Sequence, residues 1–162
     1  MSMRLFPAFA ALGALASACA GSPRAPSAVI PAVVPAELRS EYTAQVDGYL
    51  SRLAGNARNQ GYTRVVSGPL YGRLSDHATA SHEMDLIAGS DYALLGACDN
   101  DCSNLDLRLH DSAGTMQGED VESDDTPVVT FTAPSSGRYR IDVIMASCSR
   151  NPCFYGIQLV AR

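Results

Sequence analysis

The chain of 162 residues carries 12 Lys and Arg residues, all of them Arg, against 17 Asp and Glu residues, for a formal net charge of −5. This balance argues against nucleic acid as a partner, because polyanions are bound by an excess of positive charge. About 127 residues follow Pro35, which is enough chain for one domain with a single hydrophobic core.

The first 18 residues have the pattern of a signal peptide. Residues 1–4 form a weakly basic start, residues 5–16 are an apolar stretch interrupted by Pro7, and Ala16-Ser17-Ala18 is a small-residue cleavage site. About a dozen apolar residues are too few to span a bilayer of roughly 30 Å, which needs about 20. We therefore expect residues 1–18 to be removed and the chain to be exported.

Cys19 follows this leader directly. The string Leu-Ala-Ser-Ala-Cys resembles a lipobox, with Leu15 four residues before Cys19 where the usual leucine stands three before. Lipidation is favoured over ordinary cleavage after Ala18 or Ala20, because Cys19 would otherwise be an unpaired thiol in a secreted protein. We predict a periplasmic or outer-membrane lipoprotein that touches the membrane only through a lipid anchor at Cys19. The alternative is a secreted protein.

Residues 19–35 are rich in proline and alanine. Four prolines lie between residues 21 and 35, and there is no helical pattern. Such a segment is semi-extended and reaches up to roughly 45 Å at about 3.1 Å per residue. We predict a tether that holds a globular domain away from a membrane surface.

Residues 36–61 are predicted to form one amphipathic helix. Apolar residues recur here at spacings of three and four, the period of an α-helix, and Gly61 supplies a C-terminal stop. The favoured interpretation is a helix that packs on the following domain, and the alternative is a partner-binding helix with an exposed apolar stripe. The apolar positions are Leu38, Tyr42, Val46, Tyr49, Leu50, Leu53 and Ala57.

Residues 62–162 show a different period, because apolar and polar residues alternate there as they do in half-buried strands. No helical pattern lies between these strands to make parallel crossovers, and turn residues separate them at intervals of roughly 10 residues. We predict a mainly β domain with an antiparallel sandwich or barrel, preceded by the one helix. The expected strands are 65–74, 84–88, 92–97, 105–110, 127–132, 139–145 and 155–159.

Three motifs in residues 80–162 carry a family resemblance. A strand Asn-Leu-Asp-Leu-Arg-Leu runs into the turn Asp111-Ser112-Ala113-Gly114, and a later strand opens with Gly137-Arg138-Tyr139. With these motifs the segment resembles the bacterial pre-peptidase C-terminal domain, and Asn104 stands where that family has the first aspartate of its strand motif. The resemblance implies a jelly-roll-like β-sandwich, usually appended to secreted proteases, that serves binding, solubility or targeting rather than catalysis. The cysteine pairs lie outside the family pattern.

Cys98, Cys102, Cys148 and Cys153 form two close pairs, and each pair frames a short loop between predicted strands. Such pairs form disulfides in an oxidising compartment, which the leader gives access to. Local bridges, 98 to 102 and 148 to 153, are favoured over bridges crossed between the loops. Antiparallel strands can place both loops at one end of the sandwich. A four-cysteine zinc site is the alternative, although zinc ribbons prefer two-residue spacings and these intervals are three and four residues.

No cofactor is expected other than calcium, for which the acidic residues raise a hypothesis. Asp99, Asp101, Asn104 and Asp106 gather around the first cysteine loop, and calcium takes about six to eight oxygen ligands, often from loop carboxylates. The loop lacks the glycine and the terminal glutamate of an EF-hand, so a solvated acidic loop is the favoured alternative. A second acidic group before Pro127 comprises Glu119, Asp120, Glu122, Asp124 and Asp125.

No catalytic site is predicted. Ser75-Asp76-His77 and Ser81-His82-Glu83 contain the residue types of a hydrolytic triad, but triad members converge from separate elements. The chain has no Gly-x-Ser-x-Gly elbow, no His-Glu-x-x-His motif and no phosphate-binding glycine loop. His110 is expected on the outward face of its strand, because the leucines beside it point the other way.

These observations order three functional hypotheses. The first is an exported, non-catalytic cell-envelope module that binds a protein or a glycan, with the cysteine-stapled loops as the contact. The second is a structural envelope lipoprotein in a larger assembly, and the third is a secreted hydrolase with an unrecognised site. Exposed aromatic residues would favour the first and an exposed apolar helix stripe the second. A pocket that joins a serine or a carboxylate pair to a histidine would favour the third.

Overall fold

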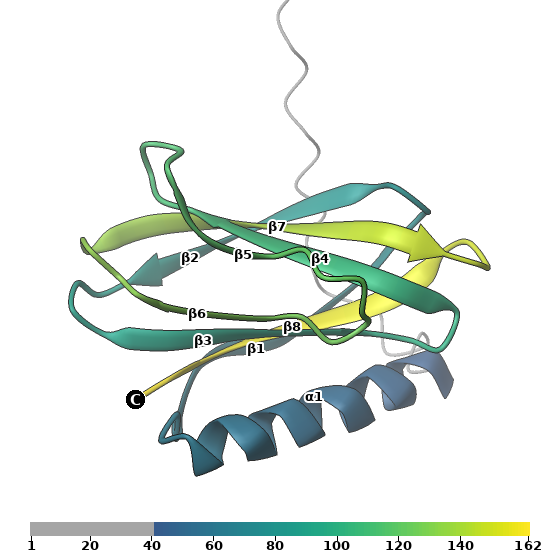
Figure 1. Ribbon diagram of the computed structural model, residues 1–162, viewed down its shortest axis with the longest axis horizontal. Helices are drawn as coiled ribbons and strands as arrows, with labels where there is room; N and C mark the ends of the chain where they lie inside the picture. The colour runs from purple at the N-terminus through teal and green to yellow at the C-terminus, as the bar shows by residue number, and fades with distance from the viewer. Residues whose placement is uncertain (1–40) are drawn as a thin grey trace, which may run out of the picture.

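A computed structural model describes residues 41–162, in which one helix lies against a two-layer β-sandwich (Figure 1). The predictions for the signal peptide, the tether, Cys19 and residues 36–40 lie outside the described residues. Within the described range, no helix is long and apolar enough to cross a membrane. The elements are α1 (Glu41–Asn59), β1 (Arg64–Leu74), β2 (Thr79–Leu86), β3 (Asp91–Cys98), β4 (Cys102–His110), β5 (Met116–Asp120), β6 (Val128–Thr132), β7 (Gly137–Cys148) and β8 (Cys153–Ala161).

The strands of this part of the chain form two four-stranded sheets, with the orders β1-β8-β3-β6 and β2-β7-β4-β5. Every neighbouring pair is antiparallel. The first strand pairs with the last in one sheet, and the second pairs with the seventh in the other, which is the strand order of a jelly roll. The predicted antiparallel jelly-roll-like β-sandwich with one preceding helix is therefore confirmed.

Two strands differ from the predicted ones. β2 begins at Thr79 rather than at residue 84, and β5 lies in a segment that was expected to be an acidic loop. Among the described strands β5 is an edge strand that pairs with β4 alone, and its residues are exposed or half-buried. Because few of its side chains enter the core, β5 carries no apolar alternation for a sequence pattern to detect.

The space between the sheets is filled by the alternating apolar side chains that the sequence indicated. Leu105, Leu107 and Leu109 of β4 point inward and are at most 1% exposed, and Ile141 and Val143 of β7 are buried to the same extent. Their polar neighbours along each strand face outward. The period of two therefore sets which face of each strand enters the core.

Helix α1 covers the outer face of the β1-β8-β3-β6 sheet (Figure 1). Val46 and Leu50 are at most 3% exposed and pack, with Ala54 and Ala57, on buried apolar residues of β3 and β8. A β-carbon added to Gly156 would lie 2.8 Å from Leu50 Cδ1, so the absence of a side chain at this position lets the helix approach the sheet. The prediction of a packing helix is confirmed, because the described part of its apolar stripe is buried or half-buried except at Tyr42.

The helix changes the burial of the strands beneath it. β3 is buried at every position after Asp91, because one of its faces meets the core and the other meets α1. The outer face of the β2-β7-β4-β5 sheet lies on the far side of the sandwich from the helix (Figure 1). The candidate surfaces of this domain are therefore that outer face, the ends of the sandwich and the open edges of the sheets.

Candidate functional site

Three connections meet at one end of the sandwich, which we call the disulfide end: the turn 75–78, the loop 99–101 and the loop 149–152. The strand register brings them together, because Leu74 at the end of β1 lies opposite Cys153 at the start of β8. Cys102 at the start of β4 likewise lies opposite Cys148 at the end of β7. The prediction that both cysteine loops lie at one end is confirmed.

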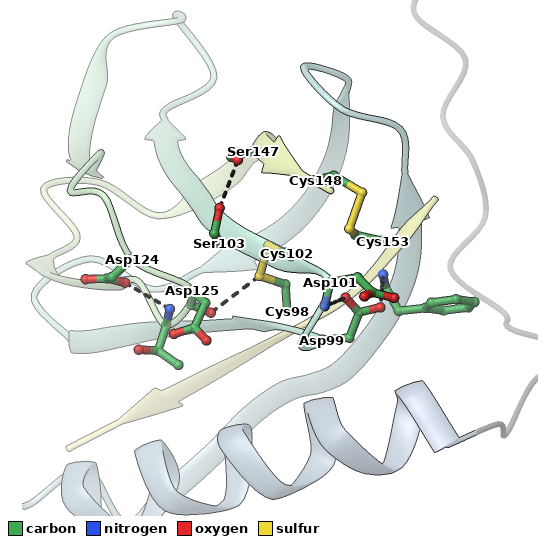
Figure 2. Close-up of a disulfide and its surroundings, with 12 residues drawn as sticks. Cys98, Asp99, Asp101, Cys102, Ser103, Asp124, Asp125, Ser147, Cys148 and Cys153 are labelled. Carbon is green, nitrogen blue, oxygen red and sulfur yellow. Dashed lines mark hydrogen bonds between the residues drawn. A yellow bond between two sulfur atoms is a disulfide. The ribbon is translucent and has the colours of Figure 1, made fainter. Parts of the chain in front are cut away.

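Two disulfides close these loops (Figure 2). Cys98 is bonded to Cys102 and Cys148 to Cys153, with a Cα–Cα distance of 5.9 Å in each pair. The local connectivity is thus the one that forms, and the crossed alternative is wrong. The zinc alternative is also wrong, because all four sulfur atoms are used in disulfides and none is a free thiolate.

Asp99 ties the first loop to the start of β8. Its side chain is 0% exposed, and its carboxylate accepts hydrogen bonds from the backbone N–H of Phe154 at 2.8 Å and of Asp101 at 3.2 Å. Burial raises the pKa of the Asp99 carboxyl above its usual range, while these backbone donors oppose the rise. The carboxylate therefore acts as an internal brace between the loop 99–101 and the start of β8, which lie far apart in sequence.

Asp76 performs the same role on the other side of the disulfide end. Its Oδ1 accepts a hydrogen bond from Cys148 N at 2.8 Å, and its own backbone N–H donates to Asn151 Oδ1 at 2.6 Å. The two disulfide loops are also bonded to each other, since Ser149 N donates to the Asp101 carbonyl at 2.8 Å. All three connections are consequently held in one arrangement.

The tips of these connections remain open to solvent. The side chain of His77 is 78% exposed and that of Arg150 is 81% exposed, and Asn100 and Asn151 are exposed as well. The Arg150 Nε lies 4.0 Å from Asp101 Oδ1, which leaves most of the guanidinium facing water. The disulfide end thus presents hydrogen-bonding groups of fixed position.

An aromatic group borders the disulfide end at the start of α1. The rings of Tyr42 and Phe154 are stacked with centroids 5.3 Å apart, and the Tyr49 hydroxyl donates to Asn100 Oδ1 at 2.8 Å. Arg52 lies 4.5 Å above the Tyr49 ring. The sequence placed both tyrosines on the apolar stripe of the helix, and tertiary packing instead leaves Tyr42 37% exposed beside the stapled loops.

The four candidate calcium ligands do not form one cluster. Asp99 and Asp101 belong to the loop, whereas Asn104 and Asp106 lie on β4. The Oδ1 atoms of Asn104 and Asp106 are buried without a hydrogen-bond partner, and burial raises the pKa of Asp106. Within residues 41–162, no three Asp, Glu, His or Cys side chains are arranged to hold a metal ion.

The second acidic group serves the backbone of its own segment. Asp124 Oδ1 accepts from Thr126 N at 2.9 Å, and Asp120 Oδ2 accepts from Val128 N at 2.8 Å. The segment also returns to the first disulfide, since Cys98 N donates to the Asp125 carbonyl at 3.1 Å. The Cys98 Sγ lies 3.7 Å from the same carbonyl oxygen (Figure 2). The two acidic groups are therefore neighbours in space, joined through backbone hydrogen bonds.

The serine and histidine residues that resembled a triad are separated by the strand pattern. Ser81 and Glu83 point outward from β2, but His82 points into the core, where its Nε2 lies 2.9 Å from the Tyr155 hydroxyl. Burial lowers the pKa of His82 and raises the pKa of Tyr155 to about 12. Asp76 and His77 do contact each other, at 3.3 Å, at the surface of the turn.

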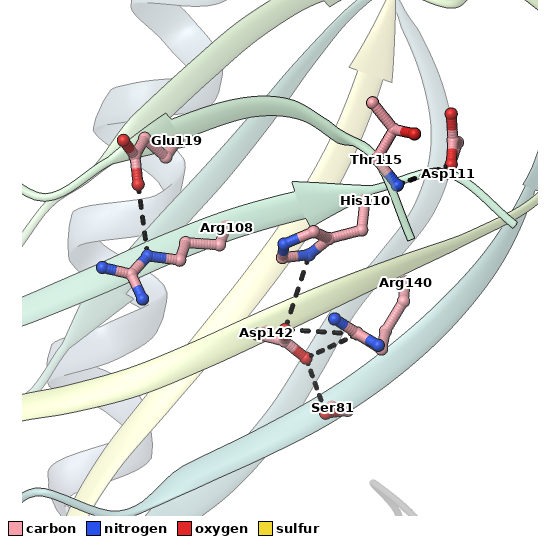
Figure 3. A network of polar contacts seen from close by, with 8 residues as sticks. All are labelled: Ser81, Arg108, His110, Asp111, Thr115, Glu119, Arg140 and Asp142. Atoms are coloured by element: carbon pink, nitrogen blue, oxygen red, sulfur yellow. Dashed lines mark hydrogen bonds and ion pairs between the residues drawn. The ribbon is translucent and has the colours of Figure 1, made fainter. Parts of the chain in front are cut away.

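A different Ser, Asp and His group lies on the outer face of the β2-β7-β4-β5 sheet (Figure 3). Ser81 Oγ donates to Asp142 Oδ1 at 2.7 Å, and His110 Nδ1 lies 3.5 Å from Asp142 Oδ2. Arg140 Nε lies 3.1 Å from the same carboxylate. In a hydrolytic relay the histidine stands between the serine and the carboxylate, whereas here the carboxylate stands between the other two. His110 lies on the outward face, as predicted.

No protein-family model matches the chain, and no curated protein matches it. Among solved structures, it is similar to Aeromonas hydrophila PliG, a periplasmic lysozyme inhibitor of g-type lysozyme, with 17% identity and a TM-score of 0.42 over 57% of this chain and 83% of that one. The Salmonella Typhimurium PliG has 13% identity and a TM-score of 0.33 over 57% and 87% of the two chains. The carbohydrate-binding module CBM36, in complex with calcium and xylotriose, has 15% identity and a TM-score of 0.33 over 60% and 90%. Similarity at this level assigns neither a ligand nor an activity to the chain.

Proposed function

We propose that the chain is an exported, non-catalytic module of the cell envelope that binds a protein or a glycan through its disulfide end. The observation that carries this proposal is the bracing of exposed connections by two disulfides and two carboxylates, Asp76 and Asp99. Binding residues are commonly placed on loops that a rigid scaffold holds in position. A braced loop loses less conformational entropy when a partner orders it, so its contacts add more to affinity.

Three further observations support the proposal. The leader-like residues 1–18 and the two disulfides agree with an oxidising compartment. The exposed ring of Tyr42 stacks on Phe154 at the start of β8, and Asn100 and Arg150 are exposed on the connections of the disulfide end. Such a surface combines apolar and hydrogen-bonding groups, which suits either a glycan or a protein. The resemblance to the pre-peptidase C-terminal domain, which serves binding or targeting, points in the same direction.

The structural-lipoprotein and hydrolase hypotheses each depend on a feature that has a different role in this fold. A structural lipoprotein was to be recognised by an exposed apolar helix stripe, but Val46 and Leu50 are buried against the sheet. A hydrolase was to be recognised by a pocket that joins a serine or a carboxylate pair to a histidine, but Ser81 on the outer face of the sheet donates to Asp142 rather than to a histidine. Both observations favour the binding module.

Site-specific photo-crosslinking tests the proposal. A photoreactive amino acid is placed at Arg150 or at Asn100 in the disulfide end, and at Ala113 in the exposed β4–β5 turn as a matched control. Each purified mature chain is irradiated with envelope fractions of the source organism, and the adducts are identified by mass spectrometry. We expect adducts from the first two positions and none from Ala113. Equal labelling at all three positions would contradict the proposed site.

A glycan partner requires a second measurement, because insoluble cell-wall polymers escape an adduct search. The wild-type chain and the Arg150→Ala and Asn100→Ala variants are sedimented with purified insoluble peptidoglycan. Loss of sedimentation in the variants supports a glycan contact at the disulfide end. If the wild-type chain neither sediments nor forms adducts, the binding function itself is wrong.

A further inference from the structure

Strand β6 is an open edge of the β1-β8-β3-β6 sheet, and within residues 41–162 the only strand that pairs with it is β3. Gly96 N donates to the Pro127 carbonyl and Ala133 N donates to the Ser90 carbonyl. The backbone N–H and C=O groups of the odd-numbered residues of β6 therefore point toward β3. In an antiparallel ladder the intervening residues direct their backbone groups the other way. The N–H and C=O groups of Thr130 and Thr132 therefore point away from the sheet.

The other edge strands of the described residues carry features that discourage pairing with a further strand. β1 contains Pro69 and two register shifts, β2 presents Glu83 and Asp85, and β5 has a register shift together with Glu119 and Asp120. Prolines, charges and bulges are the usual means of protecting an edge. β6, with the sequence Val-Val-Thr-Phe-Thr, has a continuous register and none of these features.

A groove runs along this unprotected edge. Helix α1 contacts β8 and β3, and a space of about 220 Å³ remains between the second half of the helix and β6. By comparison, a cavity of roughly 150 Å³ can hold a benzene ring, so the groove has room for an aliphatic or aromatic side chain. Its walls are Leu53, Asn56, Ala57, Gln60, Tyr62, Ala93, Leu95, Val128 and Thr130.

Carboxylates lie at both ends of the open stretch. Asp91 accepts a hydrogen bond from the Thr132 hydroxyl at 2.6 Å at one end, and Asp120 accepts from Val128 N at the other. A second copy of the chain, paired antiparallel about Thr130, would place its Asp91 near Asp120 and repel through like charges. An added strand with basic residues at its ends would meet these carboxylates favourably.

We propose that β6 is a docking edge for an extended segment of a partner protein, which adds to the sheet as a fifth strand beside Thr130 and Thr132. The segment has alternating apolar residues, one of which enters the groove beneath α1, and Lys or Arg at its ends. Main-chain hydrogen bonds supply affinity in such strand addition, and the side-chain pocket supplies selectivity. This site uses none of the residues of the disulfide end, so either proposal can fail without the other.

A synthetic peptide tests the docking edge directly. The probe is the acetylated and amidated peptide Arg-Lys-Thr-Val-Thr-Val-Thr-Val-Lys-Arg, titrated into the full mature chain by calorimetry at low salt. We expect saturable binding that weakens at least about tenfold in Thr130→Pro, because proline removes the outward N–H. Thr130→Val keeps that N–H and the side-chain shape, so we expect it to bind as the wild type does. Equal binding by the proline variant would overturn the proposal.

Two further measurements do not depend on how the proline variant folds. Alternate residues of an added strand direct their N–H groups to opposite edges of that strand. We therefore expect a peptide that is N-methylated at the residues facing β6 to lose binding, and a peptide N-methylated at the intervening residues to keep it. Hydrogen exchange at the Thr130 and Thr132 amides should slow at least about tenfold when the unmodified peptide is bound. Fast exchange at both amides in the saturated complex would place the peptide elsewhere.

Two further experiments test the role of the carboxylates and the alternative of self-association. Replacing the basic ends of the peptide by Glu should abolish binding, and Asp91→Asn combined with Asp120→Asn should reduce the preference for basic ends. Sedimentation of the chain alone should give a monomer. A dimer that Thr130→Pro dissociates would assign the edge to a second copy and overturn the assignment to a partner segment.

Discussion

The connectivity of the disulfides yields a quantitative prediction for the double substitution Cys98→Ala with Cys102→Ala. The bridge closes a loop of only five residues, residues 98–102, and the chain-entropy relation gives about 2 kcal/mol for a loop of that size. Cys98 is 0% exposed and Cys102 is 4% exposed, so lost packing of the sulfur atoms adds up to about 1 kcal/mol. We expect the free energy of unfolding to fall by about 2–3 kcal/mol, which corresponds to a melting temperature lower by about 10 °C.

Urea unfolding measures the free energy of unfolding. Titration of free thiols in denaturant tests the local disulfide pairing on which the expected value depends. With local bridges the double variant loses one disulfide and keeps the other, so its count of free thiols equals that of the wild type, including any contribution from Cys19. Crossed bridges would leave two additional thiols and remove two loops of roughly 50 residues, at a cost of about 4 kcal/mol each. Two additional thiols, or a loss near 8 kcal/mol, would refute the reasoning.

Four other substitutions have defined outcomes. Because burial lowers the pKa of His82 from 6.5, the unfolded chain binds its proton more readily, so the free energy of unfolding should decrease as the pH falls below about 6.5. His82→Gln can keep a hydrogen bond to Tyr155, and it should reduce the difference between the free energies of unfolding at pH 7.5 and pH 5.5, measured by urea titration. An unchanged difference would exclude His82 as its source. Gly156→Val should destabilise the fold by about 1–3 kcal/mol through overpacking against the helix, whereas Gly48→Ala on the open face of the helix should stabilise it by about 0.5–1 kcal/mol. Asp99→Ala should cost about 2–4 kcal/mol, because two backbone N–H groups lose a buried acceptor; a loss below about 0.5 kcal/mol would mean that water replaces the carboxylate.

Much of the fold could be predicted because strand formation leaves a local pattern. The leucines of β4, Leu105, Leu107 and Leu109, alternate with polar residues, and this alternation fixed both the strand and its inward face. β5 left no such pattern, because an edge strand with exposed side chains needs no apolar residues. Whether a strand can be recognised in a sequence thus depends on how many of its side chains are buried.

The candidate site was predictable only in part. The spacing of the cysteines indicated disulfides, and the antiparallel order placed their loops together. The role of Asp99 was not predictable, because its partner Phe154 lies 55 residues away and becomes a neighbour only through the pairing of β3 with β8. A charged residue between two cysteines is equally consistent with a solvated loop, a metal ligand or a buried brace.

By itself, the sequence determined the local features: most of the strands, the amphipathic helix, the short cysteine loops and the acidic segments. Each follows from side chains a few residues apart, whose spacing sets the face they share. Only the tertiary structure decided that α1 covers β3 and β8, that Asp142 stands between Ser81 and His110, and that β6 keeps an open edge beside a groove. These outcomes depend on contacts between distant segments, which form when two sheets and a helix bury their apolar faces together, and no local pattern encodes them.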